Sequence, residues 1–187
     1  MVTENLERAF ADTRAIVGNV RRDQLDEPTP CASWNVRALL NHIIGGPYYF
    51  AGCINDGKAP AADDTDRTGG DLVATYDEGI RQTLAGFAVP GAIDKTLEMP
   101  FGAIPASLML GVFTTDVFAH GWDLARATGQ PTDIDPQLAA ELLEGARVFL
   151  QPDFRGPDTT RPFGPEQTAP ANGSKADELA AFLGRGV

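Results

Sequence analysis

The sequence predicts an all-α protein: a four-helix up-and-down bundle with a short hairpin and a C-terminal extension that is part helical and part irregular. Three observations support this fold class. Apolar residues recur every three or four positions in several separate stretches, as in helices packed on a core. Prolines, glycines and polar segments separate these stretches. Strand-like alternation is confined to one short stretch, between Ile93 and Phe101, so a bundle of amphipathic helices is the natural architecture.

The first two helices are expected between Thr3 and Leu25 and after Ser33. Thr3 and Ser33 are suitable N-cap residues, and the prolines of DEPTPCAS separate the two helices. The apolar face of the second helix consists of Val36, Leu39, Leu40, Ile43 and Ile44. Pro47 has no N–H to donate to the carbonyl of Ile43, so we expect a kink or a local break there.

The next elements are a polar loop over residues 56–70, a third helix and a hairpin. Asp71 is expected to cap the third helix, and Val89-Pro90-Gly91 to stop it. The alternating stretch that follows predicts a small hairpin that turns between Pro100 and Gly102.

The fourth helix, from Gly111 to Gln130, is the one around which the chain is organised. Pro105 suits a first helical position and Gly129 the position after the last turn. Within its apolar surface, Asp116 and His120 are four residues apart, which places them on one face. Burying such groups unpaired is unfavourable, so they need a partner.

The last elements are a fifth helix, an irregular arm and a short helix. Asp135-Pro136 is an N-cap followed by a first-turn proline, and five prolines between residues 152 and 170 predict the irregular arm. Ser174 and Asp177 resemble a capping box that opens the short helix, which is expected to end at Gly184. We therefore expect one domain, with the bundle over residues 1–150 and the extension over 151–187 packed on it.

The composition narrows the class of protein. The 187 residues carry a net charge of −11, and an acidic surface disfavours nucleic acid and anionic membranes as partners. No stretch is long and apolar enough for a membrane span, and the charged start is unlike a signal peptide, so a cytoplasmic protein is expected. Two cysteines, Cys31 and Cys53, imply no disulfide framework. A homodimer is compatible with this composition.

His42 and His120 are the only histidines in the chain, and with Asp116 they form the candidate metal site. Two imidazoles and one carboxylate leave positions open for water or substrate, which is the pattern of a catalytic site. Zinc is the first choice, and nickel, iron(II) and manganese also suit these ligands. Asp123 is expected to orient a ligand from outside the coordination shell, or to pair with Arg126. A plainer interpretation stays open, in which the histidines are hydrogen-bonded core residues and Asp116 simply pairs with His120.

Other chemically active residues are weaker candidates. Cys53 is too far along its helix to share a metal with His42, and a buried apolar role is expected for it. Cys31 precedes a helix N-terminus, where a thiolate is stabilised, but a packed loop position is the favoured interpretation. Trp34 and Trp122 are expected to be core anchors.

Two segments, TPCASWNVRALLNHIIGG and DVFAHGWDLARATGQ, resemble the DinB-like metal-binding superfamily. More narrowly they resemble its actinobacterial branch, the mycothiol-dependent maleylpyruvate isomerase N-terminal domain type, as does the ending FGPEQTAPANGSKADELAAFLGRGV. The resemblance is strongest from Trp34 to His42 and from His120 to Arg126. It implies a four-helix bundle with a metal between helices, and it matches His42, Asp116 and His120 to the three ligands. The isomerase itself has Glu at the position of Asp116, and a separate C-terminal domain that the residues after Leu150 are too few to match.

This resemblance implies metal-dependent thiol chemistry as the leading function. A low-molecular-weight thiol, mycothiol by the resemblance, would react with a small electrophile in an S-transfer or an isomerisation. Two alternatives remain: a non-enzymatic metal- or ligand-binding bundle with a stress-response or interaction role, and an iron(II) oxygenase that uses the two-histidine, one-carboxylate set. No catalytic residue beyond the three ligands is assigned.

Overall fold

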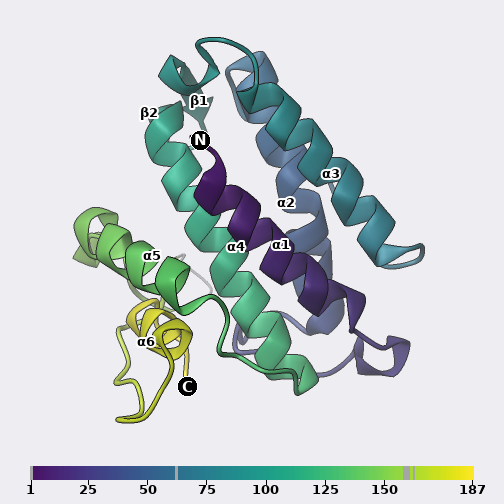
Figure 1. Ribbon diagram of the computed structural model, residues 1–187, viewed down its shortest axis with the longest axis vertical. Helices are drawn as coiled ribbons and strands as arrows, with labels where there is room; N and C mark the ends of the chain where they lie inside the picture. The colour runs from purple at the N-terminus through teal and green to yellow at the C-terminus, as the bar shows by residue number, and fades with distance from the viewer. Residues whose placement is uncertain (1, 62, 158–160, 162) are drawn as a thin grey trace.

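The computed structural model describes residues 2–61, 63–157, 161 and 163–187. These residues form six α-helices, one two-stranded hairpin and three short 3₁₀ turns (Figure 1). The helices are α1 (Glu4–Gly18), α2 (Val36–Asp56), α3 (Leu72–Phe87), α4 (Ala106–Thr128), α5 (Pro136–Phe149) and α6 (Lys175–Phe182), and the strands are β1 (Thr96–Met99) and β2 (Gly102–Pro105). The expected fold class, a helical bundle with a short hairpin, is confirmed.

Helices α1 to α4 form the bundle, but their directions do not alternate as expected. Gly79 of α3 lies against Pro47 of α2, and seven residues later Gly86 lies against Ile54. Helices α2 and α3 therefore run in the same direction, and the loop between them returns along the length of the bundle (Figure 1). The up-and-down order is wrong in this detail because a loop of this length permits either direction for α3.

Helix α2 begins two residues later than expected and continues through its proline. Asn35, not Ser33, is the N-cap, and its side chain accepts a hydrogen bond from the backbone N–H of Ala38. Pro47 lies inside an unbroken helix, so the local break is wrong. Close packing of Pro47 against Gly79, and the hydrogen bond from the Thr83 hydroxyl to the Pro47 carbonyl, hold the helix where one backbone hydrogen bond is missing.

Several expected helix ends also differ. Helix α1 ends at Gly18, not near Leu25, and a 3₁₀ turn carries the chain onward. Thr3 precedes α1 as expected, but its hydroxyl donates to the Glu7 carboxylate and does not cap the backbone. Helix α4 begins at Ala106, five residues before the expected start, with Pro105 at the N-cap position. Helix α6 ends at Phe182, two residues before the expected end.

The hairpin and the remaining caps agree with the sequence. Strands β1 and β2 pair antiparallel across the turn at Pro100 and Phe101. Asp71, Asp135 and Ser174 each accept a hydrogen bond from a backbone N–H in the first turn of the helix that follows.

Helices α5 and α6 lie beside α4, away from α3 (Figure 1). The indole N–H of Trp122, on α4, donates to the carboxylate of Asp177, on α6, over 2.9 Å. Arg155 of the intervening arm donates to the carbonyls of Gly164 and Phe182. The C-terminal segment is thus attached to the same helix that carries Asp116 and His120. Among the described residues, no helix is long and apolar enough to cross a membrane.

Candidate metal centre

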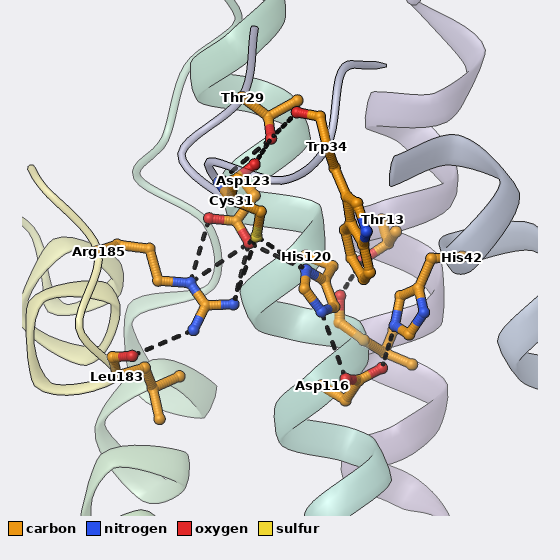
Figure 2. A network of polar contacts seen from close by, with 11 residues as sticks. Thr13, Thr29, Cys31, Trp34, His42, Asp116, His120, Asp123, Leu183 and Arg185 are labelled. Carbon is orange, nitrogen blue, oxygen red and sulfur yellow. Dashed lines mark hydrogen bonds and ion pairs between the residues drawn. The ribbon is translucent and has the colours of Figure 1, made fainter. Parts of the chain in front are cut away.

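Helices α2 and α4 bring His42, Asp116 and His120 together (Figure 2). The two helices run antiparallel, and the two imidazoles approach the Asp116 carboxylate from either side. His42 Nε2 lies 3.2 Å from one carboxylate oxygen of Asp116, and His120 Nε2 lies 3.4 Å from the other. The same ring nitrogen of each histidine therefore faces the same side chain.

These three side chains fit a divalent metal ion. Metal–donor distances of about 2.0–2.2 Å in a tetrahedral site place neighbouring donor atoms about 3.3–3.6 Å apart. The two histidine nitrogens lie 3.2 and 3.4 Å from different oxygens of Asp116, near that spacing, and one donor atom from each of the three residues lies within 4.8 Å of the others. The His42 and Asp116 side chains are 36% and 38% exposed, so one face of the cluster remains open to a further ligand.

The other ring nitrogen of His120 is held by a second carboxylate. His120 Nδ1 lies 2.9 Å from Asp123 Oδ2, three residues along α4. With the proton on Nδ1, the lone pair of Nε2 faces Asp116, as a metal ligand requires. Asp123 is completely buried and is paired with Arg185, whose guanidinium lies 3.1 Å away (Figure 2). Asp123 thus contacts the His120 ring on the side away from Asp116, and its arginine partner is Arg185 and not the exposed Arg126.

The charges of the cluster favour a positive charge at its centre. Burial raises the pKa of Asp116, but His42 and His120 outweigh burial and hold that pKa well below its ordinary value. Burial lowers the pKa of His120, yet Asp116 and the hydrogen bonds raise it well above its ordinary value. Burial likewise raises the pKa of Asp123, and Arg185 and His120 lower it to about 2. Two carboxylates and one guanidinium leave one negative charge, which a proton neutralises and a divalent cation reverses.

Trp34 and Cys31 lie against the residues of the cluster. The Trp34 ring packs against both imidazoles, with centroid distances of 4.8 Å to His42 and 5.4 Å to His120. Cys31 Sγ lies 3.3 Å from Asp123 Oδ2 and 3.9 Å from His120 Nδ1 (Figure 2). Both residues come from the segment that leads into α2, so this segment covers one side of the cluster.

A model of the mycothiol maleylpyruvate isomerase N-terminal domain matches residues 6–125, which is more than half of the chain. The chain belongs to this family. Two uncharacterised proteins of Mycobacterium tuberculosis, from strains CDC 1551 / Oshkosh and ATCC 25618 / H37Rv, are each 42% identical over 187 residues, covering 100% of this chain and 97% of theirs. A crystal structure of the mycothiol-dependent maleylpyruvate isomerase matches with a TM-score of 0.58 and 15% identity, over 76% of this chain and 70% of that one. That structure supports a common fold, and the family expected from the two sequence segments is confirmed.

Two clefts of this family member reach the cluster, and His42 and Asp116 line both of them. The loop-side cleft, about 1020 Å³, lies between α2, α4 and the loop after α2. Its other lining residues include Tyr48, Asp63, Asp64, Asp66 and Phe113. The arm-side cleft, about 480 Å³, is also lined by Cys31, Trp34, His120, Arg161 and Arg185. The loop-side cleft therefore has more carboxylates than guanidinium groups, although Arg67 also lines it, and the arm-side cleft has Arg161 and Arg185, the latter paired with Asp123.

The sequence predicted the residues at the centre of the cluster but not those that contact them. His42, Asp116, His120 and Asp123 come together. Trp122 is a buried core residue, as expected, but Trp34 contacts the two histidines. Its place in the segment from Trp34 to His42 was the available signal.

Cys53 is fully buried, and burial raises the pKa of its thiol. Arg185 carried no local signal, because its partner Asp123 is 62 residues away in sequence.

Proposed function

We propose that this protein is a metal-dependent enzyme of thiol chemistry, in which a low-molecular-weight thiol reacts with a small electrophile. His42, Asp116 and His120 hold a divalent ion, with zinc as the first choice because two imidazoles and a carboxylate suit it. The observation that carries the proposal is the approach of His42 Nε2 and His120 Nε2 to the two oxygens of one carboxylate, with one face open. The family description, which names mycothiol, supports a thiol as the partner.

The net charge of the cluster suits an anionic sulfur ligand. With neutral imidazoles, a divalent ion changes the charge balance of the cluster from −1 to +1. Bound there, the ion supplies a Lewis acid that lowers the pKa of a thiol, so that a thiolate forms near neutral pH. In the reaction a sulfur–carbon bond would form as a π bond of the electrophile breaks, and the thiol proton would pass to the atom that receives the π electrons. In an isomerisation the thiol is then eliminated and regenerated.

The side chains around the ligands orient the reactants and restrict water. Asp123 fixes the ring of His120, and Trp34 packs on both imidazoles and limits their rotation. The clefts provide room for two small molecules next to His42 and Asp116. Mycothiol and a carbon electrophile are the reactants that we propose.

The test is metal content together with thiol consumption. Protein purified without a histidine tag is expected to contain about one divalent ion per chain, and His42→Ala and His120→Ala are expected to lose it. The zinc-loaded protein is then incubated with mycothiol and a panel of electrophiles, and the loss of free thiol is followed. His42→Ala serves as the metal-free comparison in this assay, because its side chain is partly exposed and its removal is expected to leave the fold in place.

The possible results separate the alternatives. Metal binding with thiol consumption that His42→Ala abolishes supports the proposal. Metal binding without turnover of any electrophile favours a non-enzymatic binding role. Absence of metal from both the wild-type protein and the variants refutes the proposal.

A further inference from the structure

A buried ion pair links the C-terminal segment to the candidate metal centre. The Arg185 guanidinium approaches both carboxylate oxygens of Asp123: its Nε lies 3.3 and 3.4 Å from them, and its Nη2 lies 3.1 Å from Oδ2 (Figure 2). That same Oδ2 is 2.9 Å from His120 Nδ1. The Asp123 side chain is 0% exposed and that of Arg185 is 10% exposed. An arginine after α6 therefore contacts the carboxylate that holds one proposed ligand.

Asp123 needs this cation in order to remain charged in its position. An isolated carboxylate in the protein interior is strongly disfavoured unless it is paired and hydrogen-bonded. Among the described residues, the other polar contacts of Asp123 are the Cys31 thiol and His120, whose imidazole is neutral when it binds a metal. Without Arg185 the buried carboxylate would lose the group that holds it and would have to move. Such a movement would alter how His120 presents Nε2.

We propose that Arg185 is a positioning residue of the metal centre: it holds Asp123, and through Asp123 it fixes the ring orientation and tautomer of His120. The inference rests on the metal site of the proposed function, but not on the thiol chemistry. Groups that hydrogen-bond to ligating histidines affect metal affinity by about 10- to 100-fold when they are removed. Arg185 acts one contact further out, through a carboxylate for which it is the one arginine or lysine partner among the described residues.

The shape of the guanidinium is part of the inference. Two of its nitrogens approach Asp123, and Nη1 donates to the Leu183 carbonyl over 3.2 Å. Arg185 is thereby attached to the turn after α6 while it holds the carboxylate. A lysine offers the charge without this planar set of donors. Arg185→Lys should therefore restore part of what Arg185→Ala loses.

The first experiment measures zinc affinity by competition with a chromogenic chelator. Arg185→Ala is expected to weaken Zn²⁺ binding by about tenfold or more, and Arg185→Lys by less. Arg155→Ala is the matched control, because Arg155 attaches the same segment to the carbonyls of Gly164 and Phe182 without contacting Asp123. It is expected to bind Zn²⁺ as the wild type does. Equal affinity in Arg185→Ala and the wild type would overturn the inference, and so would an equal loss in Arg155→Ala.

The second experiment measures the ¹⁵N NMR signals of the His120 ring in the metal-free protein. The chain contains two histidines, so their ring ¹⁵N signals can be assigned with His42→Ala. Arg185→Ala is expected to shift the His120 signals and leave those of His42 nearly unchanged. If the wild type binds no zinc, the proposed function fails, and this measurement still decides the role of Arg185. Unchanged His120 signals, or equal shifts in Arg155→Ala, would refute it.

Discussion

Gly121 follows His120 on α4, and its missing side chain makes room for Thr13 of α1. A Cβ at this position would lie 2.5 Å from Thr13 Oγ1 and 3.6 Å from the Thr13 Cα. Thr13 is held in place because its hydroxyl donates to the Val117 carbonyl and its β-branched side chain has few alternative rotamers. Close contact between α1 and α4 beside the metal centre therefore depends on this glycine.

We expect Gly121→Ala to destabilise the protein by about 1–3 kcal/mol, because overpacking outweighs the gain in helix propensity. Urea unfolding followed by circular dichroism measures the change. Gly111→Ala is the control on the same helix, since a Cβ there meets no atom within 4 Å; it should stabilise the protein by about 0.5–1 kcal/mol. Similar stabilities for the two variants would contradict this account.

The charge of Asp116, more than its length, is expected to matter for metal binding. Asp116→Asn keeps the size of the side chain and removes the charge, and should weaken Zn²⁺ binding on the order of tenfold or more. Asp116→Glu keeps the carboxylate, and the partial exposure of Asp116 leaves room for one more methylene. Glu should therefore retain most of the affinity. Equilibrium dialysis measures both variants, and an equal loss in the two would show that position, not charge, decides.

Among single residues, the sequence predicted those that can be recognised from their spacing to neighbours in the chain. Asp116 and His120 are four residues apart on one helix, and His42 is the one other histidine, so their meeting could be expected. Arg185 could not be, because nothing near it in sequence indicates a buried carboxylate. Ser33 was the predicted N-cap, and Asn35 takes that position; serine and asparagine serve equally well as N-caps, so residue type alone does not decide between them.

Asp177 connects one element, α6, to the bundle. Its carboxylate accepts hydrogen bonds from the backbone N–H of Ser174 and from the indole of Trp122. Burial raises the pKa of Asp177, but these hydrogen bonds outweigh burial and lower it below the ordinary value of 3.8. The ionised form is thus favoured in the folded state, so the unfolded chain binds a proton more readily. The stability contributed by Asp177 is present above pH 3.8 and is lost as the pH falls through the folded pKa.

Asp177→Asn removes this titration. Near neutral pH the wild type should be more stable than the variant by about 0.3–1 kcal/mol, the usual effect of a negative charge in the first turn of a helix. The difference should shrink as the pH falls below 3.8. Urea unfolding at a series of pH values between 3 and 7 gives the free energy of unfolding of both proteins. A difference that stays constant, or grows in acid, would contradict the assignment.

The helix boundaries were predicted best where the sequence contains an N-cap residue or a helix-terminating proline or glycine. The starts at Asp71, Asp135 and Ser174 agree because each needs only one side chain and the next turn. The end of α1 was placed too late, since Leu25 is apolar and buried but lies after a 3₁₀ turn. The parallel course of α2 and α3 depends on contacts such as Gly79 with Pro47, which no local pattern reveals.

For the whole molecule, metal binding is expected to raise thermal stability. An ion that binds only the folded state adds about 2.7 kcal/mol at a concentration of 100 Kd. For a domain of this length, each kcal/mol raises Tm by roughly 2–4 °C. Wild-type protein in excess Zn²⁺ should therefore melt several degrees higher than after treatment with a chelator. His42→Ala should show no such rise, and a rise equal to that of the wild type would exclude His42 as a ligand.

The two clefts that share His42 and Asp116 have a consequence for kinetics. Because both clefts reach these two residues, both reactants of the proposed reaction have room to be bound at once. Initial rates measured against one reactant at several fixed concentrations of the other should then give intersecting, not parallel, double-reciprocal lines.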